Sequence, residues 1–451
     1  MIVILAVVAV ALAAVPNTAV TGPSWTSPVS IASGTYNSLA IALTQTSIYL
    51  GSWEYAGWAD GNVYVFGSTD GGMTWSKTDV FGLSMKDGHP NMCAYSVPGG
   101  EDVVLVASCG GWNYPSGVVA RSTDGGKSFV TLTTLPLGDP EMINGQMMYP
   151  GSWMYMAVGT RASWNGGTPD NDIFVFGARV FNGWWSGQLY LSMTVSHDNG
   201  MTWEKPWTIV PYLSYYPEVT SDGNSLYMVF DDLVQDEGYA SLYAMRSDDW
   251  GAHWTTPVPI YTRTFSDGGC DPCSLQDLGD GTALLTASDH RPIYSDNYGM
   301  WGVLRYSDLS FQKLGSVSGP EWNTDLGFAG KMLPDGRMAL GWLFFNYDTY
   351  QTEVRFTYGS NVGFPPSGDV VDRIKALMAT IDGWKLTPPV KKGLLAKLSA
   401  TLICLEKGDS TDAKNTMLAF IKMAKAQSGK GLTLEQAEYL TAEANGIIGS
   451  L

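Results

Sequence analysis

Basic residues are scarce in this sequence: 26 Lys and Arg stand against 43 Asp and Glu, which gives a net charge of −17 over 451 residues. A protein that binds phosphates generally needs a basic surface, so this balance excludes a general nucleic-acid binder. Cysteine is also sparse, and five copies are too few for a disulfide scaffold. The four histidines are scattered and no second Cys-x-x-Cys pair occurs, which argues against a zinc site.

Long apolar runs are absent beyond the first residues. Residues 1–15 read MIVILAVVAVALAAV, a run that is too short for a comfortable membrane span and ends on small residues. We predict a secretory signal peptide over residues 1–19. A retained anchor or a misassigned start is the alternative, because no Lys or Arg precedes the run. We therefore expect an extracellular protein, secreted or attached to the cell surface.

Export would permit disulfides, and two pairs of cysteines are candidates. Cys93 and Cys109 fall on successive predicted strands and could pair across them. Cys270 and Cys273 could close a small loop, although a Cys-x-x-Cys is also compatible with a redox role.

Glycine and aromatic residues are abundant, with 52 Gly, 17 Trp, 23 Tyr and 15 Phe, as is typical of many short strands joined by tight turns. The chain changes character at Asp369. From there on, 11 Lys and Arg stand against 9 Asp and Glu, so the preceding part alone carries −19, together with all but three of the aromatic residues. We therefore predict two domains, over residues 23–366 and 369–451.

An eight-residue pattern, Ser-x-Asp-x-Gly-x-x-Trp/Phe, recurs in the acidic part. Its aspartates are Asp70, Asp124, Asp198 and Asp249, which lie 54, 74 and 51 residues apart, and Asp296 in a degenerate copy, SDNYGMW, at 295–301. Ser307-Asp308 could be a further remnant. The pattern indicates a hairpin turn, because Asp accepts hydrogen bonds from turn amides and Gly supplies a positive φ. The spacing matches one four-stranded blade.

These repeats resemble Asp boxes, also called BNR repeats, and their arrangement resembles a sialidase-type β-propeller. We predict six blades, with inner strands at 37–43, 91–97, 145–149, 217–221, 273–278 and 327–333. The last blade lacks an outer strand, which residues 25–31 could supply, so that no free edge remains. A seventh blade would need one more inner strand within the 74-residue interval.

In such a blade, the loops between blades and those between the second and third strands lie on the face opposite the patterned turns. These loops are rich in carboxylates and aromatic residues, which suit sugars, and glycoside cleavage needs two carboxyl groups. Solvated acidic loops and aromatic residues that pack the blades are the alternative. The candidate catalytic residues are Asp231, Asp232, Asp289, Glu218 and Tyr216, the candidate substrate-binding residues are Arg161, Arg291, Trp53, Glu54, Trp322 and Tyr347, and Tyr350 is a further candidate hydroxyl.

The resemblance to sialidases implies three arginines that bind the substrate carboxylate, a Tyr nucleophile activated by Glu, and an Asp acid/base. It also implies an Arg-Ile-Pro-like motif near the first blade, but no Arg precedes Arg121. Arg121, Arg246 and Arg305 precede turns on the other face, which we expect them to brace. A propeller with a charge of −19 would also repel an anionic sugar. We therefore carry over the fold and the glycan association, but not the catalytic residues.

Apolar residues at helical spacing predict four helices in 369–451. Pro388 and Pro389 separate the first two, and Asp409 can cap the third. This part resembles the FIMAH domain, a helical module of exported and cell-surface proteins, through GLLAKL at 393–398, LAFI at 418–421 with Gln427 and Lys430, and LT at 432–433 with QA at 436–437. Its near-neutral charge and lack of His favour the docking of another surface protein over catalysis.

We therefore predict a mainly β protein, with a six-bladed β-propeller of the sialidase type and a small all-α domain. Its predicted function is recognition of glycans or glycoproteins at the cell surface, and its candidate activity is that of an exo-sialidase-like glycoside hydrolase. A non-catalytic adhesion or scaffold propeller of the cell envelope is the alternative. No cofactor is expected. Calcium bound by the oxygens of Asp231, Asp232, Asp236 and Glu237 is the alternative, although these residues do not form an ordered loop motif with the required spacing.

Overall fold

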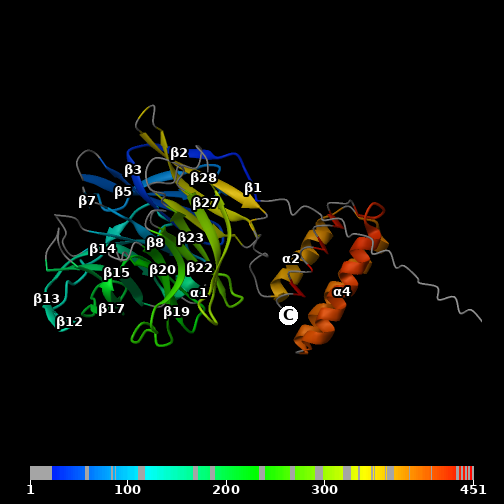
Figure 1. Cartoon of the computed structure of the whole chain (residues 1–451). Coiled ribbons are helices and arrows are strands. Elements are labelled where there is room, and N and C mark those ends of the chain that lie inside the picture. Colours follow the sequence, from blue (N-terminus) through cyan, green and yellow to red (C-terminus); the bar gives the residue numbers. More distant parts are fainter. Residues whose placement is uncertain are drawn as a thin grey trace, which may run out of the picture.

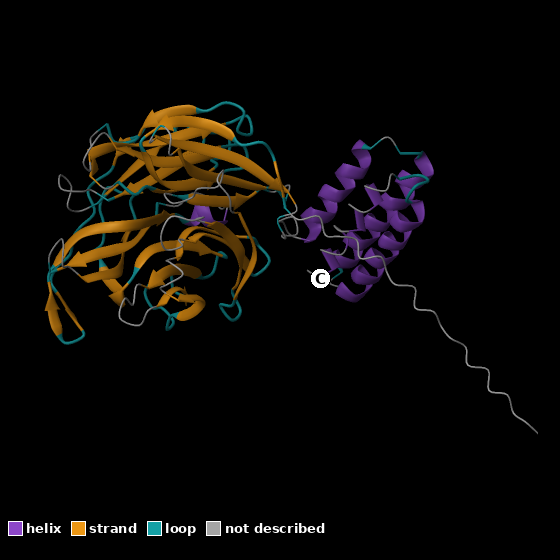
Figure 2. Cartoon of the chain, turned by 45° about the horizontal axis from the view of Figure 1, so that its top comes forward, coloured by secondary structure: helices purple, strands orange, loops and turns teal. Residues whose placement is uncertain are grey.

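The computed structural model describes a chain whose strands precede its main helices, with the strands in one body and the helices that follow them in another (Figure 1, Figure 2). The predicted leader over 1–19 lies outside the described residues. These are 23–55, 60–82, 85–86, 88–109, 117–165, 171–182, 188–232, 239–264, 270–289, 298–317, 327–333, 336–346, 349, 351–360, 362, 370–384, 386–407, 409–432, 436–437, 440–441, 444 and 447–448.

Six antiparallel sheets form the blades of a propeller, which confirms the predicted number of blades. From the inner strand outward, the first three blades are β3 (Tyr36–Leu43), β4 (Ile48–Tyr55), β5 (Asp60–Ser68) and β6 (Ser76–Asp79), with β7 (Met85–Lys86) beside β5; β8 (Asn91–Tyr95), β9 (Val103–Ser108), β10 (Val118–Ser122) and β11 (Val130–Thr131); and β14 (Pro150–Gly159), β15 (Ile173–Phe181), β16 (Gln188–Ser196) and β17 (Trp207–Leu213).

The other three blades follow the same order. They are β18 (Tyr215–Ser221), β19 (Leu226–Asp232), β20 (Tyr239–Ser247) and β21 (Val258–Thr264); β22 (Cys270–Asp277), β23 (Thr282–Asp289), β24 (Tyr298–Arg305) and β25 (Phe311–Val317); and β26 (Phe328–Met332), β27 (Met338–Asn346) and β28 (Gln351–Ser360), with β1 (Ser24–Trp25) and β2 (Val29–Gly34) beside β28.

The middle strands of the blades are buried on both faces, because each blade is packed between two others. Every residue of β9 and of β15 is buried. Apolar clusters join neighbouring blades: Val65 of the first blade and Val104 of the second belong to one cluster. A strand that is covered on both sides forms a continuous apolar run rather than an alternating one, as VVLVAS does in β9.

The N-terminal strands close the ring, as the sequence predicted. β1 and β2 pair with β28 and so supply the outermost strand of the sixth blade. The Thr26 amide donates to the Tyr358 carbonyl at 2.9 Å, and the Tyr358 amide donates back to Thr26 Oγ1 at 3.0 Å. Trp25 packs edge-on against Trp301 of the fifth blade, with 5.6 Å between the ring centroids. This closure unites the two ends of the propeller.

The predicted inner strand at 145–149 is wrong. Most of that segment belongs to a two-stranded hairpin of β12 (Glu141–Ile143) and β13 (Gln146–Met148), and the inner strand of the third blade is β14. Asn144 and Gly145 both have positive φ, 50° and 79°. An Asn-Gly pair favours this kind of tight hairpin turn, so the sequence contained a signal for the hairpin that the strand assignment missed.

A buried ion pair anchors this hairpin to the third blade. The side chain of Arg179 in β15 is fully buried, and its guanidinium pairs with the Glu141 carboxylate and donates to the Leu137 carbonyl at 2.7 Å. The outer face of the hairpin is apolar and exposed, with Met142 and Met147 directly opposite each other.

The four complete Ser-x-Asp-x-Gly turns connect the third and fourth strands of their blades. In the first, Asp70 accepts hydrogen bonds from the amides of Met73 and Thr74 at 3.0 and 2.9 Å, and the Ser68 hydroxyl accepts one from the amide of Gly72 at 2.8 Å. The hydrogen bonds from the side chain and amide of Thr74 lower the pKa of Asp70 to about 2. The pKa values of Asp124, Asp198 and Asp249 are lowered to about 2 as well, in Asp124 against the opposing effect of burial.

The degenerate copy at 295–301 is not placed as the sequence suggested. Asp296 lies outside the described residues, but Trp301, its last residue, lies in the middle of β24 and is fully buried. The turn between β24 and β25 instead contains Asp308, which accepts hydrogen bonds from the Ser310 amide and hydroxyl at 3.0 and 2.7 Å. The remnant at Ser307-Asp308 therefore occupies the turn of the fifth blade.

Helices form the last part of the described chain: α2 (Val370–Gly383), α3 (Pro388–Glu406) and α4 (Ser410–Gln427). Pro388 and Pro389 lie at the boundary between the first two helices, as predicted, and form the first residues of α3, which suits proline because the first helical amides need no partner within the helix. Asp409 caps α4, accepting a hydrogen bond from the Asp412 amide at 2.9 Å, as predicted. No helix among the described residues is long and apolar enough to cross a membrane.

The lowered pKa values of the turn aspartates predict how stability depends on pH. An unfolded Asp has a pKa near 4. The ionised carboxylates therefore stabilise the fold above about pH 4, and this stabilisation is lost as the pH falls toward 2. We expect the fourfold variant Asp70→Asn, Asp124→Asn, Asp198→Asn and Asp249→Asn to be less stable at neutral pH, with a flatter dependence of melting temperature on pH below 4. Asp139→Asn, at an exposed ion pair, is the control; an unchanged slope in the fourfold variant would contradict the prediction.

The buried ion pair at the hairpin predicts a second effect on stability. Arg179→Leu leaves the Glu141 carboxylate without its partner and should cost about 3 kcal/mol or more in the free energy of unfolding, measured by chemical denaturation. Adding Glu141→Leu should recover part of the loss. Lys127→Ala, which breaks an exposed pair with Glu101, should cost less than about 1 kcal/mol. Equal losses for Arg179→Leu and Lys127→Ala would argue against the anchoring role.

Candidate functional site

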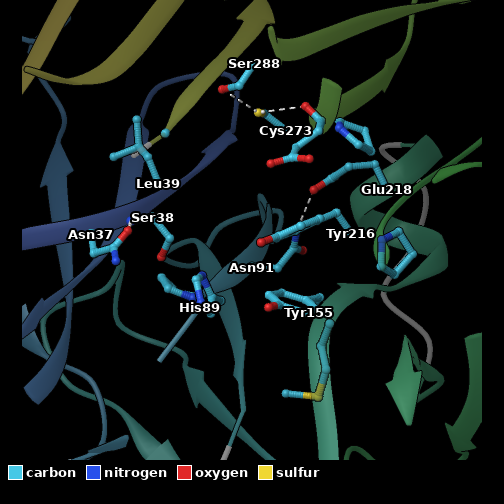
Figure 3. A pocket seen from close by; sticks show the side chains of 16 residues that line it. Asn37, Ser38, Leu39, His89, Asn91, Tyr155, Tyr216, Glu218, Cys273 and Ser288 are labelled. Atoms are coloured by element: carbon cyan, nitrogen blue, oxygen red, sulfur yellow. Dashed lines mark hydrogen bonds between the residues drawn. The ribbon is translucent and has the colours of Figure 1, made fainter. Parts of the chain in front are cut away.

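A pocket of about 140 Å³ opens at the centre of the propeller, where the inner strands begin (Figure 3). All six blades or the segments that lead into them contribute to it. The patterned turns follow the third strands and therefore lie on the opposite face. The pocket is lined by Asn37, Ser38, Leu39, His89, Pro90, Asn91, Tyr155, Met156, Tyr216, Pro217, Glu218, Asp271, Pro272, Cys273, Ser288 and Gly327.

Irregularities in four inner strands give this pocket its side chains. The pairing register shifts at Ser38 in β3, Tyr155 in β14, Tyr216-Pro217 in β18 and Cys273 in β22, and all of these residues line the pocket. Ser38, Tyr155 and Tyr216 have positive φ values of 53°, 47° and 45°. Such a conformation costs about 1–3 kcal/mol for a residue other than glycine. Three strained residues therefore line the pocket, where bulges redirect side chains.

Aromatic side chains form one wall of the pocket. The rings of Tyr155 and Tyr216 lie 4.1 Å apart between centroids, and His89 lies 5.2 Å from Tyr155. Burial raises the pKa of Tyr155 to about 12, against the effect of a hydrogen bond with Tyr216. Burial and the nearby Asp271 carboxylate raise the pKa of Tyr216 well above its usual value. Both hydroxyls are therefore protonated at neutral pH and can donate hydrogen bonds.

Glu218 lies at the floor of the pocket. Its Oε1 accepts a hydrogen bond from Asn91 Nδ2 at 2.8 Å (Figure 3), and Asn91 is held in turn by the Val158 amide at 3.2 Å. Burial raises the pKa of Glu218 to about 8, although Lys331 and the bond from Asn91 both favour its ionised form. The carboxyl is therefore mostly protonated at neutral pH.

A second cavity of about 150 Å³ continues beneath the pocket along the propeller axis. The two share three lining residues, Asn91, Glu218 and Cys273. We call the second space the lower cavity. It also contains Lys331 of β26, whose Nζ donates to the Leu275 carbonyl at 2.5 Å. Burial lowers the pKa of Lys331 to about 8, partly offset by attraction to Glu218.

Two further carboxylates belong to the pocket region. Asp271 in β22 lines the pocket and contributes to the raised pKa of Tyr216. Asp231 is buried at the end of β19, where its backbone pairs with Tyr215. Its charge also contributes to the raised pKa of Tyr216. Three carboxyl groups thus surround the aromatic wall.

The structure brings together part of the predicted catalytic set. Glu218 and Tyr216 line the pocket, and Asp231 lies beside them in β19. Asp232 and Asp289 end their strands on the same face, but their side chains are not among those described. Arg291, Trp322, Tyr347 and Tyr350 lie outside the described residues, as do Asp236 and Glu237.

The prediction that Arg161 lies on the ligand face is wrong. Arg161 begins α1 (Arg161–Asn165), which follows inner strand β14 and so lies at the face of the patterned turns. There it pairs with Asp172 at 3.2 Å, which in turn contacts His197 of the third turn at 2.7 Å. The error follows from the misplaced inner strand, because a shift by one strand moves the next loop to the opposite face.

Trp53 and Glu54 are near the pocket but do not line it. Trp53 is 4 % exposed and belongs to the core between the first two blades. Glu54 forms an ion pair with Lys77 at 2.6 Å, and Lys77 also donates to the Tyr36 hydroxyl at 2.8 Å. These contacts give both residues a structural role. Arg121 and Arg246, in contrast, brace the opposite face as predicted, through Asn199 at 2.9 Å and Asp248 at 2.5 Å.

The predicted disulfides are wrong. Cys93 and Cys109 do not bond, because Cys93 pairs with Leu105 in the sheet and Cys109 lies four residues farther along. That offset is roughly 13 Å, about twice the Cα separation that a disulfide spans. Cys273 is a thiol whose Sγ donates to the Asp271 carbonyl at 3.3 Å, so it is not bonded to Cys270.

Several lining residues were absent from the sequence-based candidates: His89, Tyr155, Asp271, Asn37 and Asn91 of the pocket, and Lys331 of the lower cavity. His89, Asn91 and Asp271 lie at or just before the start of an inner strand. Polar residues at these positions could therefore have been predicted to line the pocket. Tyr155 could not be found, because the wrong inner strand had been assigned to the third blade. Within the described residues, no three His, Cys, Asp or Glu side chains are grouped so that they could hold a metal ion.

Comparison with known proteins finds similarity in structure only. No family model matches the chain, and no curated protein matches it. A protein of unknown function from Dyadobacter fermentans is 16 % identical over 75 % of this chain and 99 % of its own, with a TM-score of 0.53. At this identity, the similarity shows the fold alone.

Two solved structures of named enzymes are more distant. An alpha-L-arabinanase from Penicillium chrysogenum, complexed with arabinobiose, is 12 % identical over 75 % of this chain and 99 % of its own, with a TM-score of 0.49. The NanB sialidase from Streptococcus pneumoniae is 12 % identical over 74 % of this chain and 70 % of its own, with a TM-score of 0.45.

The environments of two thiols predict their reactivity. Burial raises the pKa of Cys93 and of Cys273 to about 12, so neither forms a reactive thiolate near neutral pH. We expect iodoacetamide at about pH 8 to label them only after denaturation, whereas Cys404, half-buried in α3, is labelled in the native protein. Peptide mass spectrometry without reduction tests this. Peptides joined through Cys93 and Cys109 would contradict it.

Proposed function

We propose that the chain is a glycan-recognising propeller whose central pocket hydrolyses the glycosidic bond of a neutral sugar. The observation that supports this most directly is Glu218, a carboxyl that burial keeps protonated near neutral pH and that shares the pocket with Asp271. Glycosidases use one carboxylic acid of raised pKa and one carboxylate on either side of the bond they cleave.

The remaining lining residues suit a sugar. The amides of Asn37 and Asn91 and the hydroxyls of Tyr155 and Tyr216 offer hydrogen bonds to sugar hydroxyls. The paired tyrosine rings, 4.1 Å apart, offer an apolar wall to a sugar ring. A pocket with a few convergent polar groups and residues of perturbed pKa is the expected form of a binding site.

Charge favours a neutral sugar over a sialic acid. No arginine is among the described residues that line the pocket, whereas an anionic sugar calls for a cluster of guanidinium groups. The pocket region is acidic, with Glu218, Asp271 and the neighbouring Asp231, and the whole chain carries −17. The proposal therefore departs from exo-sialidase chemistry.

The proposed roles follow from the placement of Glu218 and Asp271 in one pocket. Glu218 donates its proton to the glycosidic oxygen as the bond from that oxygen to the sugar carbon breaks. The Asp271 carboxylate stabilises the positive charge that develops on the sugar. Water then adds its hydroxyl to the sugar carbon, and the proton that it releases restores the Glu218 carboxyl. Asn91 fixes the Glu218 carboxyl through the 2.8 Å hydrogen bond.

The proposal also includes the type of propeller, the identity of the helical module and the role of the leader. We propose that the patterned turns are Asp boxes of a sialidase-type propeller and that the helices form a FIMAH-like module which docks another surface protein. We also propose that the leader over 1–19 directs the protein out of the cell. The apolar core of α2 to α4, which includes Ile374, Leu398 and Phe420, supports a separate helical unit.

Hydrolysis assays on a panel of aryl glycosides test the proposed activity. We expect turnover of a neutral pentoside or hexoside and none of a sialoside. Because the acid must be protonated, kcat should fall as the pH rises through about 8. Glu218→Gln and Asp271→Asn should each lower kcat by about 100-fold or more, while Glu101→Gln, at an exposed ion pair, should leave it unchanged.

Other outcomes would change the assignment. Turnover of the sialoside would instead support assignment of the protein as a sialidase. Binding on a glycan array without turnover of any substrate would favour the non-catalytic adhesion propeller. Full activity of the Glu218→Gln variant would show that Glu218 is not the general acid.

A further inference from the structure

We propose that Lys331 is a positioning residue for Glu218: its ammonium acts as counter-charge to the Glu218 carboxylate from the lower cavity, on the side away from the substrate. This inference rests on the proposed function for its catalytic consequence. Its physical part, the electrostatic coupling of the two side chains, is independent of any substrate.

The first support is the position of Lys331. It comes from β26 in the sixth blade, lines the lower cavity with Glu218, and is not among the residues that line the pocket above. Its Nζ donates to the Leu275 carbonyl of the fifth blade at 2.5 Å. An ammonium has three donors, so one bond to a carbonyl orients the group and leaves two N–H for the cavity.

The second support is that the backbone around Lys331 is fixed. The Gln276 side chain bonds to both the amide and the carbonyl of Met332, at 2.6 and 3.0 Å. The Gly330 carbonyl accepts the hydroxyl of Ser274 at 2.7 Å. Both residues next to Lys331 are therefore hydrogen-bonded to β22, which holds the lysine beside the lower cavity.

The Glu218 carboxyl is held from the other side. Asn91 of the second blade donates to its Oε1, and Val158 of the third blade fixes Asn91. The carboxyl thus lies between a neutral donor that orients it and a cation across the lower cavity. Lys331 is not among the residues that line the pocket in which the substrate would lie.

The need for such a counter-charge follows from the reaction. When Glu218 gives up its proton, a carboxylate is left in a buried site, where an uncompensated charge is costly. A cation that stays in place lowers this cost and makes the proton easier to donate. Lys331 would therefore adjust the acid strength of Glu218 without touching the substrate.

Other titratable groups face the same pair. Cys93 from β8 and Cys273 and Asp277 from β22 line the lower cavity. Tyr155 from β14, Tyr216 from β18, Asp271 from β22 and His89 lie on the pocket side. Of the groups on the lower side, Lys331 is the one that is cationic when protonated, so its removal is a specific test.

Infrared titration of the full chain without substrate measures the coupling directly. The Glu218 carboxyl signal is isolated as the difference between the protein and its Glu218→Gln variant, and its midpoint is followed with pH. We expect Lys331→Gln, which keeps a donor for the Leu275 carbonyl but loses the charge, to raise this midpoint by about one pH unit or more. Lys331→Arg should restore it in part, and Lys205→Gln, at an exposed pair, should not move it.

Kinetics then test the catalytic consequence. In Lys331→Gln, the alkaline limb of kcat should move to higher pH by the same amount, kcat should fall, and KM should stay within about twofold. Lys331→Met, checked for folding by circular dichroism, should behave likewise. An unchanged infrared midpoint in folded Lys331→Gln overturns the inference whatever the activity. A shifted midpoint in a protein that cleaves no glycoside keeps the coupling and rejects only the proposed function.

Discussion

The fold depends on one constraint: six blades must close into a ring around an axis that their inner strands cannot fill. Each blade packs its apolar faces against two neighbours, so a missing contact anywhere would expose a core. The pairing of β1 and β2 with β28 meets this requirement by building the sixth blade from both ends of the propeller. The space left on the axis becomes the pocket and the lower cavity. Closure and the functional site are thus two results of the same geometry.

The site is built by departures from regular strand geometry. Shifts of register at Ser38, Tyr155 and Tyr216 accompany positive φ values, and each turns a side chain into the axial space. Such conformations persist only where the surrounding sheet holds them. Glu218 is buried beside these strained residues, and its burial away from bulk water raises its pKa. Rigidity and altered acidity therefore have a common origin in burial at the axis.

The sequence predicted the repeated blades better than it predicted the residues of the site. The patterned turns are local, so their residues alone predicted the blade spacing, and the strand that closes the ring followed from counting strands. The third inner strand was misplaced because 145–149 and β14 are both apolar, and only the Asn144-Gly145 turn distinguishes them. The site joins residues from six blades through bulges that no local pattern marks. Glu218 and Tyr216 were found from their place before or in an inner strand, whereas Lys331 acts across the axis and gave no signal.

Ring closure has a mechanical consequence. Ser24, the first residue of β1, lies opposite Ser360, the last residue of β28, so the polypeptide enters and leaves the propeller at one point of its rim. A pulling force applied to the two ends would load the antiparallel hydrogen bonds between these strands one after another, as in opening a zip, rather than all at once. The sixth blade would therefore peel first, and the other five would lose the support of a closed ring only afterwards. Tension between the two ends of the chain would act on the propeller at this seam.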